Sequence, residues 1–215
     1  MTNQLKQLFD KNEKINSINL LALISAAAVL RKEKIFRQLL EYTRLKKLNC
    51  LKIYEALLQT YLFAGFPIAL ISLSIFYEYY PDCRSLEIKA KKKDFYKIGE
   101  ITCRKIYGNK FEKLIENTSK FSPELANWLI FEGYGKVLSR KILSLKEREI
   151  LNISVLTSLK FENQLYSHIN GAYRNGVKIS KIKEIILTLD LLGNSSYSNF
   201  GTKLLNKYLE RKRVK

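Results

Sequence analysis

Residues that interrupt helices are scarce in this chain, and their scarcity limits what it can fold into. Only three prolines and nine glycines are spread over 215 residues, and these two residue types most disfavour a helix interior. Because 47% of the residues are apolar, a chain of this length can bury a substantial core. We therefore predict an all-α protein of long helices joined by short turns.

Capping patterns indicate where these helices begin. Ser122-Pro123-Glu124 combines a capping serine, a proline in the first turn and an acid at the positive helix end. Ser144 and Glu147 form a capping box, in which each side chain accepts from the other residue's backbone N–H. Ser17 and Ser180 are further candidate caps, and Gly65-Phe66-Pro67 predicts a break. The expected helices cover residues 17–30, 33–46, 51–63, the stretch from the break to 79, 122–133, 145–159, 162–175 and 180–192.

A weak repeat relates the two halves of the chain. With an offset of 129 residues, Glu55 lies over Glu184 and Ile24-Ser25 lies over Ile153-Ser154, without any gap. The same offset places three consecutive expected helices of the first half over three of the second. We therefore predict two tandem helical units, with an N-terminal unit over 1–81, a linker and connecting helix over 82–121, a C-terminal unit over 122–200 and a basic tail over 201–215.

The positive charge is large but spread along the chain. A formal charge of +18 raises the question of a nucleic acid or an anionic surface as a partner. The two basic clusters, 89–93 and 211–215, are not interleaved with aromatic residues as a stacking platform would be. A solvated, lysine-rich surface is the favoured interpretation and nucleic acid is not an expected partner. Steeply salt-dependent binding to DNA would mark the alternative, a basic nucleic-acid-binding protein.

Two apolar stretches resemble export or membrane signals. The first, 15–30, follows Asp10 and Glu13. A signal peptide carries a positively charged segment before its apolar core, so these two acidic residues argue against a signal peptide here. The second, 56–77, carries no charge and is long enough to cross a bilayer of about 30 Å. Its polar residues and the Gly65-Phe66-Pro67 break favour two buried helices, so we expect no membrane association.

The cysteines and the single histidine bear on location and metal binding. Cys50, Cys83 and Cys103 are far apart and show no metal-ligand spacing. We expect reduced thiols and a cytoplasmic location. With one histidine in the chain, no transition-metal site is predicted, and no nucleotide-binding motif is present, so no cofactor is expected.

Several short sequence segments in the second half of the chain together form a recognisable pattern. They are Leu138-Ser139-Arg140, Leu143 to Glu149, Gln164-Leu165, Ser167-His168, Gly171-Ala172, Asn175-Gly176-Val177 and Glu184-Ile185-Ile186. This set resembles the core of the carboxymuconolactone decarboxylase-like family, which also contains the alkylhydroperoxidase D-like peroxidases. In the first half, Glu55 to Gln59 and Leu62 to Pro67 resemble the motif of longer, duplicated members. The resemblance covers about residues 17 to 193 and implies an all-helical fold and homo-oligomers, trimers or hexamers.

The resemblance also implies which residues form the site. The peroxidase branch uses a glutamate, a CxxC pair and a histidine four residues after the second cysteine. Glu149 and His168 fall at matching positions, whereas Phe161 and Gln164 occupy the cysteine positions. Because peroxide reduction by that route needs a thiolate and a resolving thiol, CxxC-dependent peroxidase activity is not expected. The pattern is closer to the decarboxylase branch, which lacks the cysteine pair.

The first half has lost the polar residues of this pattern. The offset of 129 places Leu20 under Glu149, Ile35 under Gln164 and Leu39 under His168. We therefore expect a degenerate N-terminal unit with a structural role.

Glu149 and His168 are thus the predicted catalytic pair, meeting across two antiparallel helices as a general acid and base. Gln164, Phe161 and Arg148 are the predicted substrate contacts. The leading interpretation is a cofactor-free lyase acting on an unknown small acidic or lactone substrate. The alternative in the same fold is a non-catalytic helical assembly protein, in which Glu149 and His168 form a structural hydrogen bond.

Overall fold

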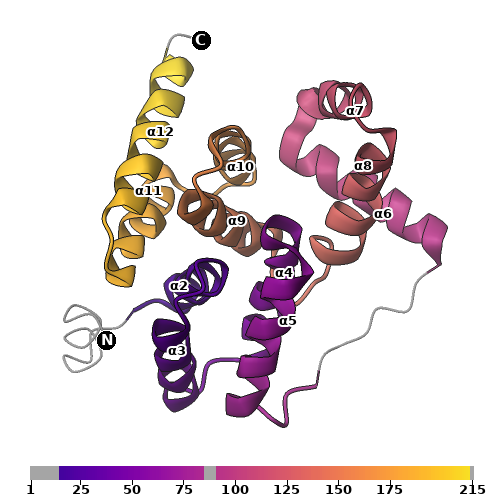
Figure 1. Ribbon diagram of the computed structural model, residues 1–215. Coiled ribbons are helices and arrows are strands. Elements are labelled where there is room, and N and C mark those ends of the chain that lie inside the picture. Colours follow the sequence, from indigo (N-terminus) through magenta and orange to yellow (C-terminus); the bar gives the residue numbers. More distant parts are fainter. Residues whose placement is uncertain (1–14, 85–90, 214–215) are drawn as a thin grey trace.

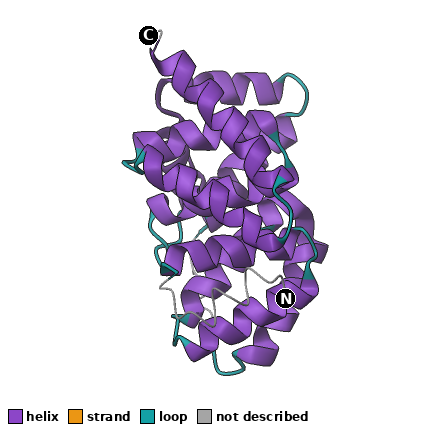
Figure 2. Cartoon of the chain, turned by 90° about the vertical axis from the view of Figure 1, so that its left-hand side faces the viewer, coloured by secondary structure: helices purple, strands orange, loops and turns teal. Residues whose placement is uncertain are grey.

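The computed structural model describes residues 15–84 and 91–213, and all regular secondary structure in these residues is helical (Figures 1 and 2). The predicted all-α fold is therefore confirmed. The elements are α2 (Ser17–Val29), α3 (Glu33–Leu45), α4 (Cys50–Gln59), α5 (Tyr61–Tyr79), α6 (Lys92–Tyr107), η1 (Gly108–Lys110), α7 (Phe111–Ser119), α8 (Pro123–Trp128), the π-helix η2 (Leu129–Val137), α9 (Leu145–Leu159), α10 (Glu162–Arg174), α11 (Ile179–Thr188), η3 (Leu189–Leu192) and α12 (Ser196–Arg213).

Two central helices, α2 and α9, carry the core. Apolar and small residues surround α2 on every side, the pattern of a helix that is buried all round. α2 and α9 pack against each other, and one continuous core contains Leu23 and Ile24 of α2 together with Ile153 and Leu156 of α9, all 0% exposed. The two halves of the chain therefore share one hydrophobic core.

The helices of the two halves have matching bounds. α3 and α10 both begin and end 129 residues apart, and so do α4 and α11. Within each half the same pairs of helices are in contact. In the first half α2 contacts α3, α4 and α5, and α5 also contacts α3 and α4. In the second half α9 contacts α10, α11 and α12, and α12 also contacts α10 and α11. The offset found in the sequence therefore also relates the positions of the helices.

The turns that end these helices match as well. Arg31 and Lys160 have φ angles of 55° and 58°, and Lys47 and Gly176 have φ angles of 53° and 82°. The amide of Lys32 donates to Ala27 over 2.9 Å, as the amide of Phe161 donates to Leu156 over 3.1 Å. A left-handed residue therefore follows the first two helices, α2 and α3 in one half and α9 and α10 in the other, at equivalent places.

Several helix boundaries differ from the sequence-based prediction. The helix predicted over 51–63 ends at Gln59, and the next helix begins at Tyr61, before the Gly65-Phe66-Pro67 break. Asn16, rather than Ser17, caps α2, and Ser180 lies inside α11. The helix that begins at Pro123 continues past Gly133 as a π-helix. Residues 201–213, predicted as a basic tail, continue α12, because Leu204, Leu205 and Tyr208 pack into the core. These boundaries depend on which apolar side chains pack into the core. A single capping residue or a run of basic residues in the sequence does not indicate that packing.

Within residues 92–128, α6, α7 and α8 gather beside η2 (Figure 1). α6 and η2 approach each other closely enough that a Cβ at Gly99 would lie 2.1 Å from the Ile130 carbonyl oxygen, and one at Gly135 would lie 2.3 Å from that of Phe95. Only glycine permits this contact. The close packing brings Cys103, Tyr107 and Tyr134 toward α9 and α10.

The apolar run 56–77 does not form two buried helices as predicted. Gly65, at φ 78° and ψ 172°, interrupts α5 near its start, as the break in the sequence indicated. Beyond it, Phe66, Leu70 and Ile71 are 68%, 64% and 52% exposed. By length and apolarity alone, α5 is the one helix among the described residues that could cross a membrane.

The prediction of three reduced thiols is wrong for two of them. Cys50 at the start of α4 and Cys83 after α5 form a disulfide, with their Cα atoms 6.1 Å apart. Sequence spacing could not reveal this pair because the hairpin of α4 and α5 brings the two ends together. Cysteine usage therefore no longer supports a cytoplasmic location. Cys103 is free and buried.

Candidate functional site

Glu149 on α9 and His168 on α10 meet in the interior of the second half of the chain. Nδ1 of His168 lies 3.0 Å from Oε2 and 3.2 Å from Oε1 of Glu149. Glu149 is 0% exposed and His168 is 4% exposed. The two helices are joined by the short turn at Lys160, which places the first turns of α9 against the middle of α10. The structure thus brings the predicted pair together as a buried, hydrogen-bonded unit.

Asn152 is the third member of this cluster and was missed from the sequence. It lies one turn after Glu149 on α9, and its Nδ2 donates to Glu149 Oε1 over 3.0 Å. The same Nδ2 is 3.3 Å from Nδ1 of His168. An asparagine at helical spacing from a predicted catalytic glutamate, within an otherwise apolar stripe, was the available signal.

Gln59 reaches this cluster from α4 in the first half. Its Nε2 donates to Asn152 Oδ1 over 2.5 Å and to the Arg148 carbonyl oxygen over 3.0 Å. Gln59 is 2% exposed. The first half therefore contributes to the polar cluster, although its own equivalent positions are apolar. The Glu55 to Gln59 motif was recognised in the sequence, but nothing there indicated which helix it would contact.

Arg148, predicted to contact substrate, is fully buried in an ion pair. Its Nη2 donates to Glu55 over 2.8 Å, its Nη1 donates to Gln59 over 2.9 Å, and its Nε and Nη2 both donate to the Arg140 carbonyl oxygen. Arg140 also pairs with Glu55, over 2.6 Å. Burial lowers the pKa of Arg148, an effect that Glu55 opposes. The structure thus places Arg148 as a link between α4 and α9, with its donors directed at protein acceptors.

The other two predicted substrate contacts lie at the start of α10. Phe161 is 44% exposed and Gln164 is also exposed, one turn before His168. Neither contacts the buried pair by a hydrogen bond. The rings of Phe63 and Tyr107 meet the imidazole edge-on, with centroids 6.0 Å and 6.4 Å away. These two half-buried rings cover His168 from α5 and α6.

Three further ionisable groups lie beside the cluster. Burial, together with the nearby carboxylate of Glu149, raises the pKa of the Cys103 thiol to about 12. Burial likewise raises the pKa of Tyr107 to about 12 and holds that of Tyr134 well above its usual value. All three groups are therefore neutral at neutral pH. The thiol of Cys103 is not an activated nucleophile.

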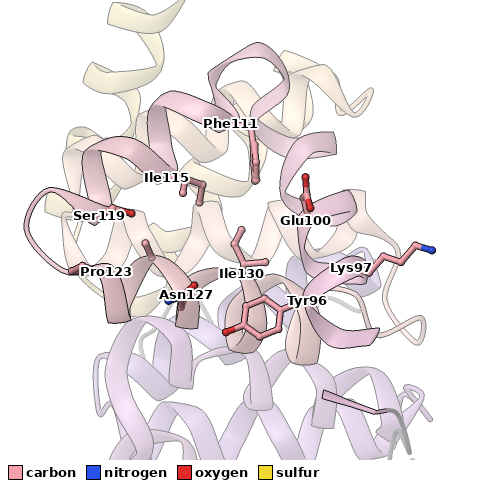
Figure 3. Close-up of a pocket in the computed structure, with 10 residues that line it drawn as sticks. Tyr96, Lys97, Glu100, Phe111, Ile115, Ser119, Pro123, Asn127 and Ile130 are labelled. Atoms are coloured by element: carbon pink, nitrogen blue, oxygen red, sulfur yellow. The ribbon is translucent and has the colours of Figure 1, made fainter. Parts of the chain in front are cut away.

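A separate hollow of about 610 Å³ opens between α6, α7 and α8 (Figure 3). Its floor is apolar and includes Phe111, Ile115 and Ile130, and the Tyr96 hydroxyl and the Asn127 amide lie at one side (Figure 3). Phe111 and Ile130 belong to the same small apolar cluster as Cys103. Glu149 and His168 are not among the residues that line the hollow. Among the described residues, no three His, Cys, Asp or Glu side chains gather as a metal ion would require.

Comparison with known proteins gives consistent similarities. Residues 123–196 match the model of the carboxymuconolactone decarboxylase family. The chain is 30% identical over 105 residues to the 4-carboxymuconolactone decarboxylase of Acinetobacter baylyi, a match that covers 48% of this chain and 78% of that protein. It is 32% identical over 81 residues to Peroxisomal protein 2 of Schizosaccharomyces pombe, covering 37% of this chain and 38% of that protein. The region matched by the family contains Glu149, Asn152 and His168.

Proposed function

Since this chain belongs to the carboxymuconolactone decarboxylase family, we propose that it is a cofactor-free lyase that decarboxylates a small acidic lactone. The observation that carries this proposal is the buried Glu149–His168 pair, with 3.0 Å between Oε2 and Nδ1, in the region that the family matches. A proton-transfer pair of this kind suits a reaction that consumes one proton and needs no redox partner.

The reaction breaks the bond between a ring carbon and its carboxylate group. Carbon dioxide leaves, and the electron pair of the broken bond stays on the ring, where the lactone carbonyl delocalises it. One proton must then be added to carbon. In the proposed mechanism His168 takes a proton from solvent at Nε2 and delivers it to the ring, while Glu149 stabilises the transient imidazolium through Nδ1.

Substrate must reach a pair that is almost completely buried. Phe63 and Tyr107 cover His168 but are themselves only half-buried. Phe63 lies two residues before the break at Gly65, so its turn of α5 is not continuous with the rest of that helix. We propose that displacement of these rings admits the lactone, beside the exposed Gln164 and Phe161.

We further propose that the two helical units arose by tandem duplication. The shared bounds of α3 and α10 and of α4 and α11, together with the matching left-handed turns, support this origin. In the first unit leucine occupies both positions of the acid–base pair.

Release of carbon dioxide from 4-carboxymuconolactone by the full chain tests the proposed activity. That substrate is chosen because the Acinetobacter baylyi relative bears its name. Removing a general acid or base slows a reaction by about 10²- to 10⁴-fold, so His168→Gln and Glu149→Gln are expected to lose activity by that factor. Arg37→Gln, which removes a surface ion pair with Glu78, is the matched control and should retain full activity. Equal rates for wild type and His168→Gln would refute the proposal.

The deep burial of the pair favours a second candidate, a non-catalytic assembly protein. With Glu149 0% exposed and His168 4% exposed, the hydrogen bond alone would stabilise the contact between α9 and α10. This candidate predicts no carbon dioxide release by the wild type from any lactone tested. It also predicts that diethyl pyrocarbonate leaves His168, the single histidine of the chain, unmodified in the folded protein.

A further inference from the structure

We infer that the outer side of α12, where it packs against α10, binds the phosphate backbone of a single-stranded nucleic acid. This function is independent of the proposed decarboxylation. Four exposed cations, here called the basic row, form the surface: Lys203, Lys207, Arg211 and Lys212. The basic cluster at 211–215 has no aromatic neighbours along the sequence, so the sequence did not predict such a partner. The fold supplies the aromatic residues from another helix.

The cations of the basic row follow one side of α12. Lys203, Lys207 and Arg211 recur every four residues, which spaces them about 6 Å apart along the helix. Lys207 pairs with Glu162 at the start of α10 over 2.7 Å. Lys207 chiefly, with help from Lys203 and Arg211, lowers the pKa of the Glu162 carboxyl. Three cations therefore share one carboxylate, and positive charge remains in excess along this side.

Two tyrosines of α10 lie beneath the end of the basic row. Arg211 lies over the ring of Tyr166, 5.5 Å from its centroid, and Lys212 lies over that of Tyr173, 3.9 Å away. Both rings meet the buried ring of Tyr208 edge-on, which fixes their positions. Within the described part of the chain, neither Arg211 nor Lys212 forms an ion pair with a carboxylate. Their charges are therefore available to an external anion.

The first unit shows that the fold does not require these charges. At the offset of 129, buried positions of α5 match those of α12: Ala69, Ser72, Ile75 and Phe76 correspond to Ser198, Gly201, Leu204 and Leu205. The positions of the basic row are occupied in the first unit by Ser74, Glu78, Asp82 and Cys83. The same side of the same helix thus carries two carboxylates in one unit and four cations in the other. Packing does not require this reversal, whereas a negatively charged partner does.

The side chains around the basic row distinguish among anionic partners. A helix that binds a lipid surface directs apolar side chains outward, but the apolar side of α12 is buried in the core and none of its large apolar residues is exposed. Proteins that bind single strands combine a line of cations along the backbone with aromatic rings for the bases. The basic row and Tyr173, which is 41% exposed, match that combination. The stacked bases of a duplex could not use the ring.

Binding of a fluorescein-labelled oligothymidine to the full chain tests the inference. An oligonucleotide of about 20 residues is longer than the row and has no stable structure of its own. Fluorescence anisotropy measures its affinity between about 50 and 200 mM salt. Because a single strand gives a slope of about −0.7 per neutralised phosphate, four cations predict a slope of log affinity against log salt near −3. No binding at the lowest salt, or a slope near zero, would overturn the inference.

The triple variant Lys203→Gln/Arg211→Gln/Lys212→Gln removes most of the basic row and keeps the pair of Lys207 with Glu162. All three replaced side chains are exposed, so the core is unchanged. The slope should become shallower by about 2, and the affinity at about 0.1 M salt should fall roughly 100-fold. An unchanged affinity would overturn the inference.

The matched control is the triple variant Lys34→Gln/Lys113→Gln/Lys141→Gln. It removes three exposed cations from other parts of the surface and therefore has the same net charge as the first variant. Its affinity should stay at the wild-type value if the basic row, rather than the overall charge of +18, binds the strand. An equal loss in both triple variants would overturn the inference.

Three further probes test the class of partner. A duplex of the same length, vesicles of phosphatidylserine and a polyglutamate of similar charge should each bind the wild type more weakly than oligothymidine does. Equal or tighter binding of any of them would overturn the assignment to a single strand. Carbon dioxide release is measured separately, so loss of either activity leaves the other proposal standing.

Discussion

The two units fill the same buried positions with opposite chemistry. Glu149, Asn152 and His168 of the second unit correspond, at the offset of 129, to Leu20, Leu23 and Leu39 of the first. All six side chains are buried, the leucines at 3%, 0% and 0% exposed. The leucines show that this arrangement of helices packs well without any polar group. Buried ionisable groups generally cost stability compared with apolar ones, so the fold does not explain why the second unit keeps its polar cluster.

A second difference lies where each unit contacts the other. Arg148 donates to Glu55 and to Gln59. Asn19, the residue equivalent to Arg148 in the first unit, donates to Glu184 and Thr188. Glu184 and Thr188 are in turn the residues equivalent to Glu55 and Gln59, 129 positions later in the chain. The contact thus follows an approximate two-fold relation, in which each unit uses the same positions. One side carries a buried charge pair, whereas the Glu184 side chain on the other is 49% exposed. The buried side is the one that contacts the polar cluster.

The largest expected effect comes from breaking the buried side of this contact. Glu55→Leu leaves Arg148 charged and fully buried without its partner, which should lower the free energy of unfolding by about 3–5 kcal/mol. Glu184→Leu removes the half-exposed counterpart and should cost less than about 1 kcal/mol. Urea unfolding of both variants measures the difference. Equal losses would show that the two sides of the contact are energetically alike.

The disulfide distinguishes the first unit from the second. The positions equivalent to Cys50 and Cys83 hold Ile179 and Lys212, so the second unit has no such link. A bridge with a separation of 33 residues typically contributes about 2–4 kcal/mol, and the double variant Cys50→Ser/Cys83→Ser should lose this amount. Hydrogen exchange should then accelerate in α4 and α5 while α11 and α12 keep their protection. Faster exchange in both units alike would contradict this assignment.

Copying the apolar pair of the first unit into the second tests the cost of the polar cluster. His168→Leu alone leaves the Glu149 carboxylate buried without its imidazole, and adding Glu149→Leu should recover about 0.5–3 kcal/mol of unfolding free energy. The double variant should have no decarboxylase activity. If it unfolds at lower urea concentration than His168→Leu, the polar pair contributes to packing in a way that leucine cannot replace.

The smallest effect concerns the left-handed turns. Lys47 and Gly176 occupy equivalent positions, with φ angles of 53° and 82°. Since a side chain costs about 1–2 kcal/mol in a left-handed conformation, Lys47→Gly should raise the thermal unfolding temperature slightly and Gly176→Ala should lower it. Changes of the same sign in both variants would show that the two turns are not equivalent.

The fold was largely predictable from local patterns. The capping box of Ser144 and Glu147, the start at Pro123 and the left-handed Gly176 depend on residues within one turn of each other. The offset of 129 likewise required only the sequence. The π-helix η2 and the packed part of α12 were missed because close contact with other helices, at Gly135 and Tyr208 for example, decides them.

The candidate site was predictable only in part. Glu149 and His168 were identified by resemblance, and Asn152 could have been found from helical spacing. Gln59 and Glu55 could not be assigned to the site, because they lie on another unit about 90 residues earlier, at separations of 93 from Asn152 and Arg148. Arg148 was predicted to bind substrate because a sequence does not show whether an arginine's donors are already engaged.

The sequence by itself determined an all-helical chain, its two similar sets of helices and its family, because each of these depends on the order and spacing of neighbouring residues. The tertiary structure alone decided that Cys50 joins Cys83, that Phe66 and Leu70 stay exposed, and that Gln59 of one unit donates to Asn152 of the other. These features depend on which surfaces meet across α4, α5 and α9. That choice is set by burial summed over the whole core rather than by any local pattern.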